Sequence, residues 1–302
     1  MAQVIRSRER SDRLRTASAG RHVSEQRTAR FAGSFRALGR LAYDGAQVSA
    51  NVVDLGTGET LLAIDDRIVL PTASIGKVLL LIEVSARLSA RDDSGYGIVD
   101  KPPAGLVGSA GVWQHLQAPS LPIADLATLV GSSSDNVATN LLINRVGLEA
   151  VRARTESLGL SRTALLDFAR DARGPDDAPQ LSVGSTEELA RLFGMLAREE
   201  VVDGPTSQRV MGWLSLNSDL SLVASAFGLD PLAHRSSDHS TLLINKTGSD
   251  AGVRSEAGAL RGRRTAVAYA VSVHFADDSL ARRLSVVEGM RAVGEELLEY
   301  VH

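Results

Sequence analysis

The sequence has no cysteine, only three lysines and an aromatic content of 4% among its 302 residues. Without cysteine, the chain can form no disulfide bond, no thiolate nucleophile and no cysteine-ligated metal site. No apolar run approaches the length of about 18 residues that marks a membrane-spanning helix, so we expect no contact with a membrane. The net charge of −3 lacks the basic excess that phosphate contacts need, so we expect no nucleic-acid partner.

Several catalytic signatures are also missing. No His-Glu-x-x-His motif occurs and the six histidines are scattered, so we predict no metal site and no other cofactor. No Gly-x-Ser-x-Gly motif accompanies the histidines, which argues against a Ser-His-Asp triad. Any nucleophilic catalysis must therefore use another base.

The first residues, 1–24, are rich in arginine, and no apolar signal-peptide segment follows them. We expect a flexible, solvated arm. If Met1 is the true start, the expected location is the cytoplasm. A missing upstream start would instead make the protein periplasmic or secreted.

Apolar spacing indicates strands near both ends of the chain and helices between them. Helices are predicted over 27–41, 74–90, 122–130, 137–146, 148–158, 185–198, near 205–216 and over 280–300. Strands are predicted in 46–55, 60–64, 240–248, 252–260 and 264–275. The expected fold class is α/β (α+β): an antiparallel sheet built from both termini and flanked by helices, with an inserted all-α lobe. We expect the sheet lobe to comprise 25–70 and 205–302, the helical lobe 71–204, and the active site to lie between them.

One lysine stands in an unusual place. Lys77 lies in the apolar stretch VLPTASIGKVLLLIEV, three residues after Ser74 at the start of a predicted helix. Residues three apart share a helix face, and a buried amine can lose its proton and activate a neighbouring hydroxyl. A helix cap at Ser74 is the simpler alternative, and the pair alone does not decide between them.

Two further stretches carry polar groups at the ends of elements. Ser134 and Asn136 lie with an aspartate between them in GSSSDNVATN, where a capping cluster is the simpler interpretation. Lys246, Thr247 and Gly248 end a strand in LLINKTGSDAG, where the glycine would let another backbone approach closely.

Taken in order, Ser-x-x-Lys, Ser-Asp-Asn and Lys-Thr-Gly resemble the signature of class A β-lactamases and penicillin-binding proteins, and the likeness extends over about residues 27–300. The resemblance implies that Ser74 is acylated and that Lys77 helps to remove its proton. It implies that Ser134 delivers a proton to the departing nitrogen and that Lys246 keeps this region electropositive.

The resemblance also implies a substrate-binding set. Asn136, Thr247 and Gly248 would bind the substrate, and Arg254 could pair with a substrate carboxylate. The backbone N–H groups of Ser74 and Ser249 would hold the oxyanion, as donors typically worth about 3 kcal/mol each.

The chain departs from the resemblance in one loop. Class A β-lactamases carry a glutamate there that activates the water for deacylation, whereas residues 158–184 contain no glutamate. Arg170 or Asp171 falls at the matching position. Asp171 is the possible deacylation base, with Asp167 as a weaker substitute, and its shorter side chain suggests weak hydrolysis of the acyl-enzyme.

Three functions remain open at this point. The first is a serine hydrolase of class A β-lactamase type that cleaves an amide or β-lactam-like small molecule. The second is a D,D-peptidase-like amidase or acyltransferase on a cytoplasmic substrate, and the third a non-turnover penicillin-binding protein. A monomer or a dimer would suit each.

Overall fold

A computed structural model of the protein describes residues 30–103, 107–108, 110–235 and 240–302. The arginine-rich arm over 1–24 lies outside the described residues. The helices of the described part are α2 (Ala32–Tyr43), η1 (Ala73–Gly76), α3 (Lys77–Ala90), η2 (Asp93–Gly95), η3 (Trp113–His115), α4 (Ile123–Ser133), α5 (Asn136–Val146), α6 (Leu148–Ser157), α7 (Thr186–Ala197), α8 (Gly204–Leu214), η4 (Val223–Ala226) and α9 (Leu280–Val301). The strands are β1 (Gln47–Asp54), β2 (Thr60–Ile64), β3 (Leu70–Pro71), β4 (Ile98–Asp100), β5 (Ser120–Pro122), β6 (Ala164–Leu165), β7 (Ser182–Gly184), β8 (Leu242–Asp250), β9 (Val253–Arg261) and β10 (Ala266–His274).

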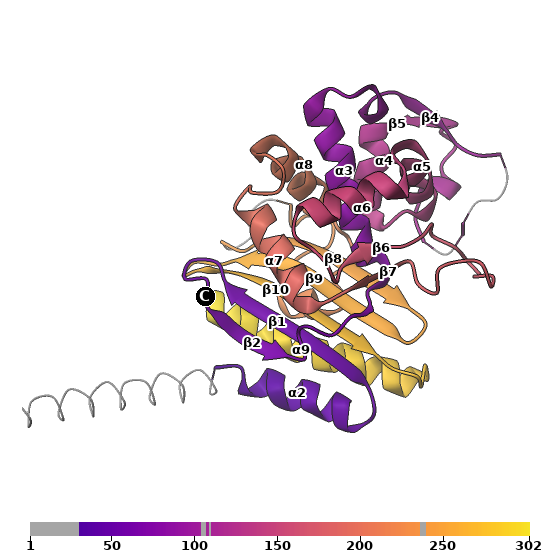
Figure 1. Ribbon diagram of the computed structural model, residues 1–302. Helices are drawn as coiled ribbons and strands as arrows, with labels where there is room; N and C mark the ends of the chain where they lie inside the picture. The colour runs from indigo at the N-terminus through magenta and orange to yellow at the C-terminus, as the bar shows by residue number, and fades with distance from the viewer. Residues whose placement is uncertain (1–29, 104–106, 109, 236–239) are drawn as a thin grey trace, which may run out of the picture.

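The main sheet has five strands in the order β2-β1-β10-β9-β8. Every pairing in it is antiparallel. Strands from the two ends of the chain therefore meet at its centre, where β1 lies beside β10 (Figure 1). This confirms the predicted fold class, an antiparallel sheet from both termini flanked by helices.

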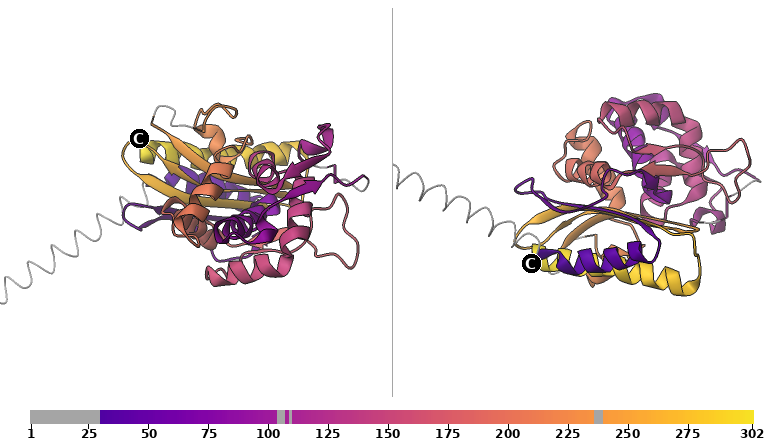
Figure 2. Two further views of the ribbon diagram at one scale, coloured as in Figure 1. Left: turned by 90° about the horizontal axis from the view of Figure 1, so that it is seen from above. Right: turned by 60° about the horizontal axis from the view of Figure 1, so that its bottom comes forward.

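Helices cover both faces of this sheet. The terminal helices α2 and α9 pack on each other and on one face, and α7 packs on β1, β9 and β10 from the other (Figure 2). One hydrophobic core lies between the sheet and α2, α9 and η4. A second core joins the remaining helices to the face that α7 covers.

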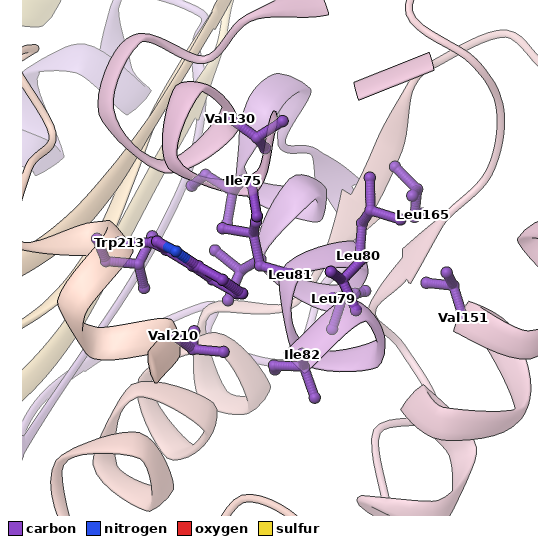
Figure 3. Close-up of a cluster of buried hydrophobic side chains, with 14 of the residues drawn as sticks. Ile75, Leu79, Leu80, Leu81, Ile82, Val130, Val151, Leu165, Val210 and Trp213 are labelled. Carbon is purple, nitrogen blue, oxygen red and sulfur yellow. The ribbon is translucent and has the colours of Figure 1, made fainter. Parts of the chain in front are cut away.

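Helix α3 runs through the centre of the second core. All residues from Lys77 to Ala86 are buried, so the helix has no solvent-facing stripe at its N-terminal end. Leu79, Leu81 and Ile82 point to different sides of the helix and meet side chains of the surrounding helices (Figure 3). A helix that is apolar on all sides is typical of a fully buried position.

The boundaries proposed for the two lobes stay predictions. Helix α7 belongs to the middle of the chain but packs on the sheet, and α8 follows it yet packs on α3 and α4. The chain thus crosses between the two layers more than once. No helix of the described ranges is long and apolar enough to span a membrane.

Candidate active site

Ser74 lies in a tight turn before the helix that was expected to start with it. The turn is the 3-10 helix η1, and the α-helix begins only at Lys77. Ala73, the residue before the serine, has a φ of 47°. Residues other than glycine seldom adopt this left-handed region. Such strain persists only where the surroundings hold it in place, and it is often found at functional sites.

Ser182, on β7, holds this turn through its hydroxyl. Its Oγ donates to the Ala73 carbonyl at 2.6 Å and lies 2.8 Å from Oγ1 of Thr72. The N–H of Gly76 donates to the same oxygen at 3.3 Å. One fully buried hydroxyl therefore contacts residues on both sides of Ser74.

Gly248, on β8, brings a second backbone against the turn. A Cβ at this position would lie 2.1 Å from the carbonyl oxygen of Thr72 and 3.1 Å from the nitrogen of Ser74. Any side chain here would push the strand away from the serine. The close backbone approach predicted from the sequence is therefore present.

Lys77 is completely buried, with a relative exposure of 0%. Its Nζ donates to Oδ1 of Asn136 and to the carbonyl of Ser134, both at 2.6 Å, and lies 3.1 Å from Oγ of Ser134. Burial and the positive charge of Lys246 hold the pKa of Lys77 well below its usual value, and the Asp135 carboxylate opposes this shift. The surroundings of the amine therefore favour its uncharged form over the ammonium.

The turn between α4 and α5 presents Ser134 to that amine. Ser134 has a left-handed φ of 56°, which ends α4. Asp135 caps α5 by accepting from the N–H of Ala138 at 2.9 Å, and it accepts from the N–H groups of Val112 and Trp113 at 2.8 Å each. The capping role considered from the sequence thus falls to Asp135, while Ser134 and Asn136 face Lys77.

Lys246 is also fully buried, in the strand that carries Gly248. Its Nζ donates to the carbonyl of Thr247 at 2.7 Å. Burial lowers the pKa of Lys246 to about 8, against the opposing charges of Asp219 and Glu256. Lys246 therefore remains mostly protonated at neutral pH.

Glu256 lies on β9 opposite Thr247 and is fully buried. Its Oε1 accepts from the hydroxyl of Tyr269 at 2.7 Å and from the amide of Asn245 at 2.8 Å. Burial raises the pKa of Glu256 to about 7, although these two hydrogen bonds lower it in part. The carboxyl of Glu256 therefore gains or loses its proton near neutral pH, next to the strand that carries Thr247.

Arg254 pairs with Ser249 across the β8–β9 hairpin. Its guanidinium donates to the carbonyls of Asp250 at 2.8 Å and Val253 at 2.7 Å. Its pairing with a substrate carboxylate stays a prediction.

The loop after β6 carries the aspartates that were considered as a base. Asp167 is nearly buried and forms ion pairs with Arg170 at 2.9 Å and Arg173 at 2.7 Å. Asp171 is exposed and accepts from the N–H of Gly108 at 2.9 Å. Its role as deacylation base stays a prediction.

Ala169 is the residue of this loop whose backbone is hydrogen-bonded to helix α5. The side chain of Asn140 donates to the Ala169 carbonyl at 2.9 Å and accepts from its N–H at 2.8 Å. Asn140 lies one turn after Asn136 on α5, so the two asparagines share a face. An alanine, rather than Arg170 or Asp171, is thus the loop residue pinned beside this face.

Sequence reasoning missed three residues of this region. Ser182 gave no local signal, since it is a lone serine far along the chain from the turn that it holds. Asp135 carried a capping signal but was given no role of its own. Asp219, which borders Lys246 and Thr247, lies in a loop without a motif. Within the described ranges, no group of three or more acidic or histidine side chains could hold a metal ion.

Solved structures with the same fold include a β-lactamase from Sphaerobacter thermophilus DSM 20745, with a TM-score of 0.77 and 22% identity over 90% of this chain and 97% of that one. A class A β-lactamase from Mycobacterium abscessus has a TM-score of 0.71 and 17% identity, covering 86% and 97%. A mutant of PBP-A, solved as an acyl-enzyme complex with penicillin G, has a TM-score of 0.71 and 19% identity, covering 89% and 95%. At such identities these structures are evidence for the fold.

The family is shown by a different comparison. A search of curated proteins found no match. A model of the β-lactamase enzyme family, however, matches residues 31–301, which is nearly the whole of the described chain. The protein therefore belongs to the β-lactamase enzyme family and is a serine hydrolase that acts on amide bonds.

Proposed function

We propose that Ser74 opens a β-lactam-like amide by forming an acyl-enzyme, and that water releases the acyl group only slowly. The observation that carries the first half is the buried amine of Lys77, whose pKa is lowered by burial and which lies 3.1 Å from the hydroxyl of Ser134. An amine without its proton is a base, and a serine three residues before it is the group that it can activate.

In the proposed steps, a proton passes from Ser74 through Lys77 and Ser134 to the leaving nitrogen. Ser74 Oγ gives its proton to Lys77 and attacks the carbonyl carbon. The oxyanion is held by the N–H groups of Ser74 and Ser249, which Gly248 brings together. Lys77 passes the proton to Ser134, whose own hydroxyl proton goes to the nitrogen as the C–N bond breaks. Two of the three contacts of Lys77 are to pure acceptors, so in the neutral amine the lone pair is left for a hydroxyl.

Slow release is supported by the state of the loop carboxylates. Asp167 is neutralised by two arginines and Asp171 is engaged by a backbone N–H. Burial would raise the pKa of Asp167, but hydrogen bonds with Arg170 and the Phe168 N–H together lower it, which makes it a poor base. The position held beside α5 is Ala169, which has no carboxylate.

The absence of a carboxylate at Ala169 also favours a second candidate, an amidase-like acyltransferase whose acceptor is an amine. A cavity of about 560 Å3 beside the loop is lined by Asn140, Ala169, Arg170 and Asp171 among others. It offers room for an acceptor larger than water.

Intact-mass spectrometry after mixing with penicillin G tests the proposal. We expect an adduct of one penicillin that persists for minutes, and its absence together with rapid nitrocefin turnover would refute slow release.

Ala169→Glu places a carboxylate on the residue that Asn140 holds next to the cavity, and we expect it to shorten the adduct's lifetime at least tenfold. Pro175→Glu, an exposed position of the same loop that does not line the cavity, is the control and should leave the lifetime unchanged. Adding an amine acceptor such as glycine amide separates the second candidate, which requires faster release.

A further inference from the structure

Asp219 lies at the edge of the site, on the segment that follows α8. The residues before it are anchored on two sides. The side chain of Asn217 donates to Oδ1 of Asn245 on β8 at 2.9 Å, and both are buried. The N–H of Ser218 donates to the carbonyl of Ser132 at the end of α4 at 2.9 Å. Asp219 is therefore held between the strand that bears Thr247 and the turn that bears Ser134.

The carboxylate of Asp219 contacts Ser221 and Thr247 and lies near Lys246. Oδ1 accepts from the N–H of Ser221 at 3.1 Å and from its hydroxyl at 2.6 Å. The hydroxyl of Thr247 also donates to it, and Lys246 is close enough to interact with its charge. Burial would raise the pKa of Asp219, but these hydrogen bonds and the charge of Lys246 together lower it, so the group is an anion at neutral pH.

This arrangement changes what a substrate meets at the Lys246–Thr247 end of the site. Lys246 is fully buried and directed at a carbonyl, whereas Asp219 is partly exposed. The hydroxyl of Thr247 already donates a hydrogen bond to the carboxylate of Asp219. The guanidinium of Arg254 is directed at the hairpin carbonyls. The partly exposed charge that contacts Thr247 is therefore negative.

We propose that Asp219 determines specificity by repelling acyl donors that carry a carboxylate at this end and favouring donors that carry an ammonium there. The inference rests on the proposed function, acylation of Ser74, and names the substrate class for it. A like charge that cannot be moved away is a common means of excluding a competing ligand. The expected order of preference is cationic, then uncharged, then anionic.

Three thioesters of phenylacetylglycine provide the test, because they differ only in the leaving thiol. The thiols are 3-mercaptopropanoate, 2-methoxyethanethiol and thiocholine, which are anionic, uncharged and cationic. Released thiol is measured with a colorimetric thiol reagent, to which a protein without cysteine contributes no background. Since the thiols differ in leaving ability, each probe is compared with itself between wild type and variant.

The variant Asp219→Asn removes the charge and keeps an oxygen for Ser221. We expect its acylation rate constant to rise roughly tenfold for the anionic probe and to fall roughly tenfold for the cationic probe, both relative to the uncharged one. Asp277→Asn is the matched control: Asp277 is exposed and accepts from the N–H of Ser279 at 3.0 Å and from its hydroxyl at 3.1 Å. It forms the same Asp-x-Ser turn outside the site and should change none of the three rates.

An equal change for all three probes would overturn the inference, because it would mean that Asp219 only positions Thr247 or Lys246. So would a wild-type preference for the anionic probe that survives the substitution. Asp219→Ser, which keeps a hydroxyl for Thr247, must reproduce the result if Asp219→Asn folds poorly. Failure of the proposed function is distinguishable, since no probe would then release thiol faster than with Ser74→Ala, and both claims would fall together.

Discussion

The side-chain nitrogen of Lys77 donates to Oδ1 of Asn136 at 2.6 Å and joins the central helix α3 to the first residue of α5. The contact is buried on both sides. An amide oxygen can accept from an amine without requiring a charge on it, whereas a carboxylate in the same place would stabilise the ammonium form. Asn136 thus keeps Lys77 in place while leaving it free to be uncharged.

Asn136→Asp should reverse that balance. The new carboxylate favours protonated Lys77, so the pKa of Lys77 rises and the fraction of neutral amine at pH 7 falls. Because each unit of pKa removes about tenfold of the neutral amine at pH values below that pKa, the acidic limb of the acylation rate profile should move to higher pH by about one unit or more. Stopped-flow measurements with penicillin G from pH 5 to 9 would follow the shift.

Asn144→Asp is the control for this substitution. Asn144 lies on the same helix, two turns further on, and is exposed. It introduces the same charge without facing Lys77, so its profile should match that of the wild type. Equal profiles for both variants would show that Asn136 does not set the charge of the amine.

Ser182→Ala removes the hydroxyl that holds the turn around Ser74. We expect the acylation rate constant to fall about tenfold or more, because small displacements of a nucleophile are costly to catalysis. The free energy of unfolding should fall by about 1–3 kcal/mol, as for other lost buried hydrogen bonds. Ser207→Ala removes another buried hydroxyl, which accepts from the N–H of Val201 and donates to its carbonyl, both at 3.0 Å. This variant should lower stability similarly while leaving acylation intact. If the two variants lose the same amount of activity, Ser182 has no specific positioning role.

Glu256 links stability to pH. Its pKa is about 7 in the folded protein against an ordinary value of 4.5, so the folded state binds more protons than the unfolded state between these values. The free energy of unfolding must therefore decline as pH rises through this window, by about 3 kcal/mol in total.

Glu256→Gln keeps an acceptor for Tyr269 and Asn245 but has no proton to lose. We expect urea unfolding at pH 5 and pH 8 to show a much smaller loss of stability in this variant than in the wild type. Glu288→Gln, an exposed position on α9, should retain the wild-type difference. A wild type with equal stability at both pH values would contradict the assignment.

The longer elements were predictable because their apolar spacing repeats over several turns or strand pairs. Helices α3 to α9 and strands β1, β2, β8, β9 and β10 lie within a few residues of the expected ranges. The two- and three-residue strands were not found, since so short a segment shows no periodicity. The start of α3 at Lys77 was missed for a related reason: the turn at Ala73 is enforced by Ser182 from another part of the chain.

The site divides along the same line. Ser74, Lys77, Ser134 and Lys246 belong to local patterns with recognisable spacing, and the structure brings them together around one turn. Asp219 belongs to no pattern, and its meaning comes from contacts to Thr247 and Ser221 that exist only after folding. The three lysines illustrate the contrast: two are buried in the site, and Lys101 lies 5.8 Å from the ring of Trp113.

The central claim is that a hydroxyl at position 74, activated by the buried amine beside it, attacks an acyl carbon. Its most direct test is intact-mass and peptide-mass analysis of the wild type and Ser74→Ala after incubation with penicillin G. We expect one covalent penicilloyl group on the peptide that contains Ser74 in the wild type and none on the variant. An adduct of the same stoichiometry on Ser74→Ala, or acylation of a different residue in the wild type, would contradict the account.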